Sequence, residues 1–216
     1  IRSIDSTDPE RGTINMAGVN ALHQGIELDF NFRPIRNLEI TGMLSLGDWE
    51  WKNNATGYLY NRDGQAVNSR GDQVELMGPD HTFVTLNLDG IKVGNSAQTS
   101  TNIGVNYKFL DGFKFGLDYT YHARNYSNFN VIINNWGVNK FEQPWMIPAA
   151  GVFDLFANYQ FKIGEHRATV FGNVNNLLNV SYIADGQTGG TNTWETAQVY
   201  YGFGRVWSMG LKVSFN

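Results

Sequence analysis

The chain of 216 residues contains no cysteine, so it has neither a disulfide framework nor a thiolate metal site. It also lacks a long apolar run. The longest, residues 146–153, is interrupted by Pro148 and leaves no segment for a transmembrane helix. The formal net charge of −4 comes without a basic cluster, which argues against nucleic acid as a partner. The start at Ile1 shows no signal segment, and we expect it to lie inside a larger polypeptide.

The apolar residues that are present recur with a period of two. In residues 207–215 every large apolar residue has an odd number, from Trp207 to Phe215, and every even position is small or polar. A strand with this pattern has one apolar and one polar face. The mean hydropathy of −0.33 does not exclude a membrane location, because half of each strand of a transmembrane barrel faces water.

Seven segments of the chain alternate in this way. We predict strands around residues 19–32, 38–51, 102–109, 113–122, 153–162, 167–174 and 207–215. Charges near the middle of these strands fall on the polar side, whereas Asp48, Glu50 and Arg205 break the pattern only at strand ends. Aromatic residues gather near strand ends, as the interfacial girdles of a barrel require. The sequence therefore predicts an all-β fold, an antiparallel transmembrane β-barrel segment.

The connections between these strands alternate between short and long. The short ones cover residues 33–37, 110–112 and 163–166, and the long ones cover about 53–98, 123–150 and 178–198. Short turns of bacterial outer-membrane barrels face the periplasm, so we expect a periplasmic C-terminus and extracellular long loops. Residues 82–88 also alternate and are expected to form a β-extension of their loop above the membrane. Seven antiparallel strands do not close a single-chain bacterial barrel, which predicts that residues 1–216 are the C-terminal part of a larger one.

Four stretches of the sequence stand out, namely residues 19–28, 94–100, 175–182 and 202–205, the last followed by the terminal strand. They resemble TonB-dependent outer-membrane receptors of the Bacteroidota type. The most specific is the Asn-Asn-Leu-Leu-Asn run that begins at Asn175 and leads to Tyr182. One departure is Asn216, because such barrels commonly end on the aromatic residue itself. The resemblance extends over essentially the whole chain.

The resemblance implies a 22-stranded barrel with a plug domain, in which TonB supplies the energy to import a scarce ligand. The plug and the N-terminal strands would then lie outside residues 1–216. The implied partners are those remaining strands, the plug, the TonB complex acting through the plug, outer-membrane lipid and a surface lipoprotein. Siderophore, cobalamin, glycan and peptide all remain open as the ligand.

Possible chemical sites carry less weight. Asp118 and His122 lie four residues apart on one strand, which places them about 13 Å apart and out of contact. His23, His81 and His166 are scattered without a ligand spacing, so no metal site is predicted. We expect no catalytic residue and no cofactor, and the chain is not predicted to be an enzyme. The alternatives are a passive porin, which would lack a plug, and a barrel enzyme, which would need a catalytic cluster at its outer rim.

The long loops are the best candidates for ligand binding, because they combine exposed aromatic residues with many amides. Such side chains stack on a ligand and hydrogen-bond to it. The alternative is that they pack the loops against one another. The predicted ligand contacts are Tyr126, Phe129, Trp136, Trp145, Trp194, Tyr200 and Tyr201.

Overall fold

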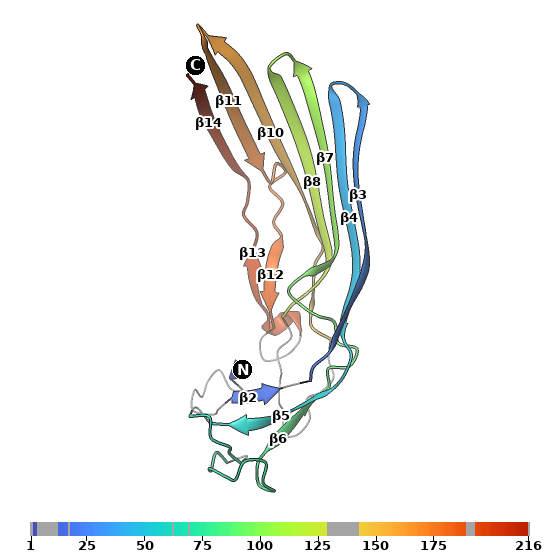
Figure 1. The fold of residues 1–216 in the computed structure, drawn as a ribbon, viewed down its shortest axis with the longest axis vertical. Helices are drawn as coiled ribbons and strands as arrows, with labels where there is room; N and C mark the ends of the chain where they lie inside the picture. The colour runs from blue at the N-terminus through green and yellow to red at the C-terminus, as the bar shows by residue number, and fades with distance from the viewer. Residues whose placement is uncertain are drawn as a thin grey trace.

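The computed structural model describes residues 2–3, 13–16, 18–61, 63–68, 70–128, 143–188 and 193–215, and structural statements below refer to these residues. Its main element is an antiparallel sheet in which seven long strands follow one another in chain order (Figure 1). These strands are β3 (Ala21–Ile35), β4 (Leu38–Trp51), β7 (Ala97–Leu110), β8 (Phe113–Tyr126), β10 (Ala150–Ile163), β11 (His166–Asn175) and β14 (Val206–Ser214). The prediction of seven strands is confirmed, including the segment around residues 167–174, which becomes β11.

The register of the sheet turns the alternation of each strand into two continuous faces. Leu155 of β10 stands opposite Leu117 of β8 and Val174 of β11, while Asp154 stands opposite Asp118. Because the side-chain period is two, this register carries through all seven strands. We call the side with the even residues of β3, β4 and β11 and the odd residues of β7, β8, β10 and β14 the apolar face. The opposite side is called the polar face.

The short connections are tighter than the sequence predicted. β3 continues through Pro34, with a shift of register between Phe32 and Ile35, so the first turn contains only residues 36–37. A bulge at the edge of a sheet tolerates a proline, which cannot donate a ladder hydrogen bond. The other turns are residues 111–112 and 164–165, in which Gly112 and Gly164 adopt positive φ angles of 84° and 61°. We call this the turn end of the sheet and the opposite end the loop end.

Smaller elements lie at the loop end. β1 (Arg2–Ser3), β2 (Thr13–Met16), β5 (Ala55–Tyr60) and β6 (Phe83–Leu86) form a separate sheet, and β12 (Ile183–Gln187) pairs with β13 (Gln198–Tyr201). The short β9 (Met146–Ile147) pairs with the end of β8. The expected β-extension within residues 82–88 is confirmed, because β6 pairs with β5 and not with a long strand. None of the described helical segments is long and apolar enough to span a membrane.

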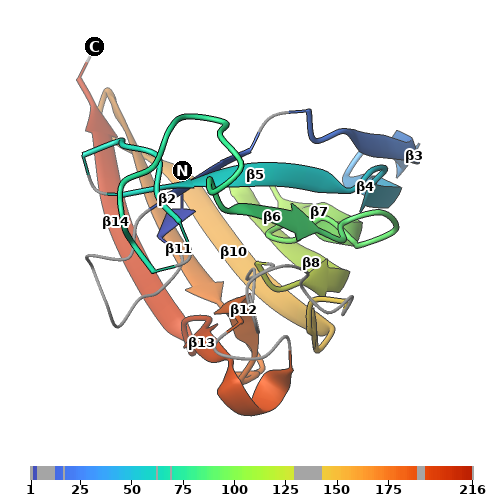
Figure 2. The same cartoon turned by 90° about the horizontal axis from the view of Figure 1, so that it is seen from below.

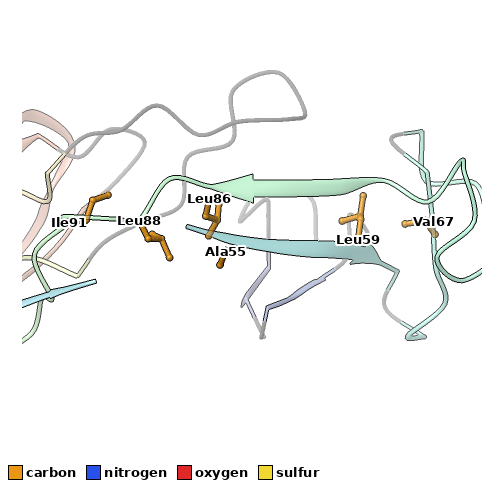
Figure 3. Close-up of a cluster of buried hydrophobic side chains, with 6 residues drawn as sticks. All are labelled: Ala55, Leu59, Val67, Leu86, Leu88 and Ile91. Atoms are coloured by element: carbon orange, nitrogen blue, oxygen red, sulfur yellow. The ribbon is translucent and has the colours of Figure 1, made fainter. Parts of the chain in front are cut away.

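The buried core lies within the first long loop, not in the main sheet. Of the described buried apolar residues, only Ala168 belongs to the seven long strands. The loop core, shown in Figure 3, consists of Ala55, Leu59, Val67, Leu86, Leu88 and Ile91. In contrast, Ile26, Met209 and Trp207 of the apolar face are 72–74% exposed. Figure 2 shows this sheet as a curved wall with β3 and β14 at its edges.

Candidate functional site at the loop end of the sheet

The two charges of β4 that break the alternation form a cluster at the loop end. Lys92, from the first long loop, contacts Asp48 Oδ1 at 2.5 Å and Glu50 Oε2 at 3.3 Å through its Nζ atom, and Lys52 pairs with Glu50 as well. The hydrogen bond to Asp48 raises the pKa of Lys92 above its ordinary value. Asp48 and Glu50 lie on the apolar face near the loop end of β4, and cations of the adjacent loop neutralise them there.

Side-chain hydrogen bonds tie the long connections to one another. Gln143 donates from Nε2 to the Gly90 carbonyl oxygen at 2.8 Å and accepts from the Lys92 amide at 3.0 Å. The Thr188 hydroxyl donates to the Asn128 carbonyl oxygen at 2.7 Å. The three long connections thus meet at one end of the sheet, as the predicted topology requires.

Two of the predicted ligand contacts lie at the base of these connections. Tyr126 ends β8, is partly buried and stands opposite Met146 of β9. Trp145 is also partly buried, and a Cβ atom on Gly186 would lie 3.2 Å from its Cζ3 atom. The indole therefore packs against β12. This contact favours loop packing over ligand contact for Trp145.

Three other predicted contacts lie on the hairpin of β12 and β13 and are open to solvent (Figure 1). Trp194 begins the 3₁₀ turn Trp194–Thr196 and is 66% exposed, and Tyr200 and Tyr201 of β13 are 54% and 66% exposed. The structure thus brings these three residues together on one hairpin. Phe129 and Trp136 lie outside the described residues, so their role stays a prediction.

The polar face has a hollow that was not predicted from the sequence. It has a volume of about 480 Å³ and lies near the loop end of β10, β11 and β14. An aromatic ring from Tyr182 packs over Gly202, and Phe203 is 86% exposed. The residues that line the hollow include Val152, Asp154, Asn175, Tyr182, Phe203 and Val206.

The asparagines of the Asn-Asn-Leu-Leu-Asn run hold this region together. Asn176 and Asn179 have positive φ angles of 51° and 54°, a conformation that asparagine tolerates better than most residues. The Asn176 side-chain amide donates to the carbonyl oxygens of Val180 and Phe203 at 2.8 and 3.0 Å. Its backbone amide donates to Asp154 Oδ1 at 2.7 Å. The run was singled out in the sequence by resemblance alone, whereas these bonds explain it physically.

The remaining polar candidates have separate surroundings. Asp118 stands opposite Asp154, while His122 Nδ1 lies 3.2 Å from Ser100 Oγ on the neighbouring strand. His81 is buried, where Nδ1 accepts from the Met77 amide at 3.0 Å. In the described part of the chain, no group of three or more histidine and carboxylate side chains is arranged to hold a metal ion.

A sheet of long antiparallel strands with one exposed apolar face and one polar face is the architecture of a transmembrane β-barrel wall. The sequence matches the family described as TonB dependent receptor-like, beta-barrel, over residues 5–177. The chain therefore belongs to this family, whose members carry out TonB-driven transport across the bacterial outer membrane and are not enzymes. No curated protein matches the sequence.

Proposed function

We propose that this chain is the C-terminal part of the wall of a ligand-specific outer-membrane importer of the Bacteroidota type. Membership of the family indicates TonB-driven transport in general. The observation that supports our more specific proposal is that the seven-stranded sheet is open. Each edge strand, β3 and β14, pairs with a described long strand on one side only. Unpaired strand edges do not persist in hydrocarbon, which favours further strands of the same receptor as their partners. A plug domain would belong to that missing part.

The arrangement of connections supports an orientation for this wall. Two-residue turns at one end contrast with long, mutually docked connections at the other. By the general rule for bacterial barrels, the turn end faces the periplasm and the loop end faces the cell exterior. The C-terminus then lies in the periplasm. In this orientation the apolar face contacts lipid and the polar face lines the lumen.

The exposed hairpin is our candidate for ligand capture. Trp194, Tyr200 and Tyr201 present aromatic surface to solvent, where it is available for stacking on a ligand. Trp145 is assigned to the support of this hairpin, since it is partly buried and packs on β12. Tyr126, at the end of β8, remains a proposed contact. Phe129 and Trp136 remain proposed contacts on sequence grounds. A surface lipoprotein remains a proposed partner on the same grounds.

The test is uptake by the full-length receptor in a strain that lacks its own copy. Siderophore, cobalamin, glycan and peptide would each be supplied at limiting concentration to cells with and without functional TonB. We expect uptake of one class that depends on TonB. Replacing Trp194, Tyr200 and Tyr201 together with alanine should lower that uptake, while Leu76→Ala, another exposed apolar loop residue, should not.

Two outcomes would contradict the proposal at different points. Uptake that is unchanged without TonB would favour the passive porin. Unchanged uptake by the triple variant, with normal surface levels of receptor, would assign the hairpin aromatics to loop packing instead.

A further inference from the structure

A second hollow of the polar face lies at the turn end of the sheet. Its volume is about 270 Å³, and residues of β3, β4, β7, β8 and β10 line it together with the first turn. Four of the lining side chains are cations and one is a carboxylate. These charged residues are Arg33, Arg36, Lys108, Lys114 and Glu39. The hollow therefore carries an excess of positive charge.

Contacts within the wall neutralise only part of this charge. Arg33 binds Glu39 Oε1 at 2.6 Å through its Nη2 atom, so this carboxylate is already paired. Lys108 Nζ lies 3.2 Å from Asp111 Oδ1, but Asp111 is fully exposed in the adjacent turn, where an ion pair is weak. The described residues provide Lys114 with no ion pair.

The two lysines of the hollow face each other on neighbouring strands. The register sets Lys108 of β7 directly opposite Lys114 of β8. Like charges at such positions destabilise a strand pair, and sequences break local rules of this kind chiefly at functional positions. Arg36, in the first turn, adds a further cation that has no ion pair among the described residues. An anion held between these side chains would remove the repulsion.

The open space of the hollow depends on Gly116 of β8. Gly116 stands opposite Asn106 of β7 and Phe156 of β10, and both of these side chains line the hollow. A Cβ atom at position 116 would collide with the ring of Phe156 and lie 2.8 Å from Asn106 Oδ1. A larger residue would therefore push these side chains into the space beside the lysines.

The groups that line the hollow fit an oxyanion. Ammonium and guanidinium groups bind phosphate and carboxylate through charge-assisted hydrogen bonds, which are stronger than those between neutral groups. A concave site with low-dielectric walls also focuses the field of its charges. The volume of about 270 Å³ lies just below the range of about 300–1,000 Å³ for complete ligand pockets. This size favours one anionic group of a solute over a whole large ligand.

We propose that this hollow is an oxyanion subsite that binds a phosphate or carboxylate group of the imported solute. Lys108, Lys114 and Arg36 hold the anion, while Arg33 stays paired with Glu39. The inference rests on the import function and the orientation proposed above, in which the turn end faces the periplasm. The subsite then lies at the exit of the lumen. It narrows the class of solute to molecules with an exposed oxyanion.

Two variants weaken the subsite by different means. Lys114→Gln removes one cation, whereas Gly116→Ala keeps every charge and forces the ring of Phe156 toward the hollow. The matched control is Arg70→Gln, which makes the same charge change as Lys114→Gln at an exposed loop position. Heat-modified gel migration checks that each variant contains a folded barrel.

The measurement is NMR line broadening of inorganic phosphate and of isotope-labelled acetate by the purified full-length receptor, in a phosphate-free detergent and without TonB. We expect the wild-type receptor to bind at least one of these anions, and the stronger of the two identifies the group. Lys114→Gln should weaken binding roughly tenfold through the loss of a charge-assisted hydrogen bond. Gly116→Ala should weaken it as well, and Arg70→Gln should not. Raising the salt from about 0.1 M to 1 M should weaken wild-type binding, because salt screens the charges.

Three results would overturn the inference. If the wild-type receptor bound neither anion, the hollow would be closed by the rest of the receptor. If Lys114→Gln bound as well as wild type, the cations of the hollow would have no part in binding. If Arg70→Gln lost as much binding as Lys114→Gln, only the overall charge would matter. None of these measurements involves transport, so failure of the import proposal is detected separately by the uptake experiment.

Discussion

The strands of the seven-stranded wall and those of the first long loop both alternate apolar and polar residues, but their apolar side chains lie in different surroundings. In the wall, Ile26 and Met209 are 74% and 73% exposed on the apolar face. In the loop, Leu59 and Ile91 are 3% and 0% exposed within a compact core. Alternation therefore shows that a strand has two faces, but the rest of the structure decides whether the apolar one meets lipid or protein. Here the exposed apolar face belongs to the region with the longest strands.

Glycine has a different purpose in the two regions. On the wall, the ring of Phe156 covers Gly116, a position where any Cβ atom would collide with the ring. In the loop, Gly64 and Gly71 occupy positive φ angles of 78° and 90° in two similar turns. The wall thus uses the missing side chain for space, while the loop uses the freedom of the backbone.

The largest expected effect lies in the loop core. Leu59→Ala removes a buried side chain and should cost roughly 2–5 kcal/mol of the local stability of the loop. The barrel should still assemble, because the core residues near Leu59 belong to the loop. Limited proteolysis of intact cells would show faster cleavage within residues 53–92 and normal amounts of receptor. Leu76→Ala, at a position 61% exposed, should leave cleavage unchanged, and equal sensitivity of both variants would contradict a packed loop core.

A slightly smaller effect is expected on the wall. Leu211→Arg places a charge on the apolar face of β14 and should cost about 2–4 kcal/mol if that position meets the bilayer interior. Lys212→Ser changes the neighbouring residue on the polar face and should have much less effect on assembly. Accumulation in the outer membrane, followed by heat-modified gel migration, compares the two. Equal tolerance would count against the assignment of the faces.

The smallest of these effects is the difference between two variants at Asn176, where β11 of the wall meets the third long connection. Asn176→Ala loses the side-chain bonds to Val180 and Phe203 and strains a positive φ angle, by about 1–2 kcal/mol for the backbone alone. Asn176→Gly loses the same bonds without that strain. Hydrogen exchange at residues 177–182 should be faster in both variants, and more so for alanine. If alanine and glycine behaved alike, backbone strain would have no part in the junction.

The wall was predictable from the sequence because each strand carries its own period of two. The first turn was not, because no local pattern indicated that β3 continues through Pro34 by a change of register. The loop core depends on contacts between segments distant in sequence, such as β5 and β6, of which only the alternation near Leu86 was visible.

The candidate site was predictable only in part. Exposed Trp194 and Tyr201 agree with the surface position expected of the loops. The packing of Trp145 on Gly186 joins residues about 40 positions apart, and no local pattern encodes such a contact. The hollow beside Asp154 depends in the same way on bonds from Asn176 to a distant loop.

The central claim is that the apolar face contacts lipid and the polar face lines the lumen. The chain contributes no native cysteine, so spin labels can be attached at single cysteines introduced along residues 153–161 of the full-length receptor. Relaxation by oxygen, which concentrates in lipid, should peak at odd positions such as Leu155. Relaxation by a water-soluble nickel chelate should favour even positions such as Asn158. A reversed pattern, or one without a period of two, would contradict the account.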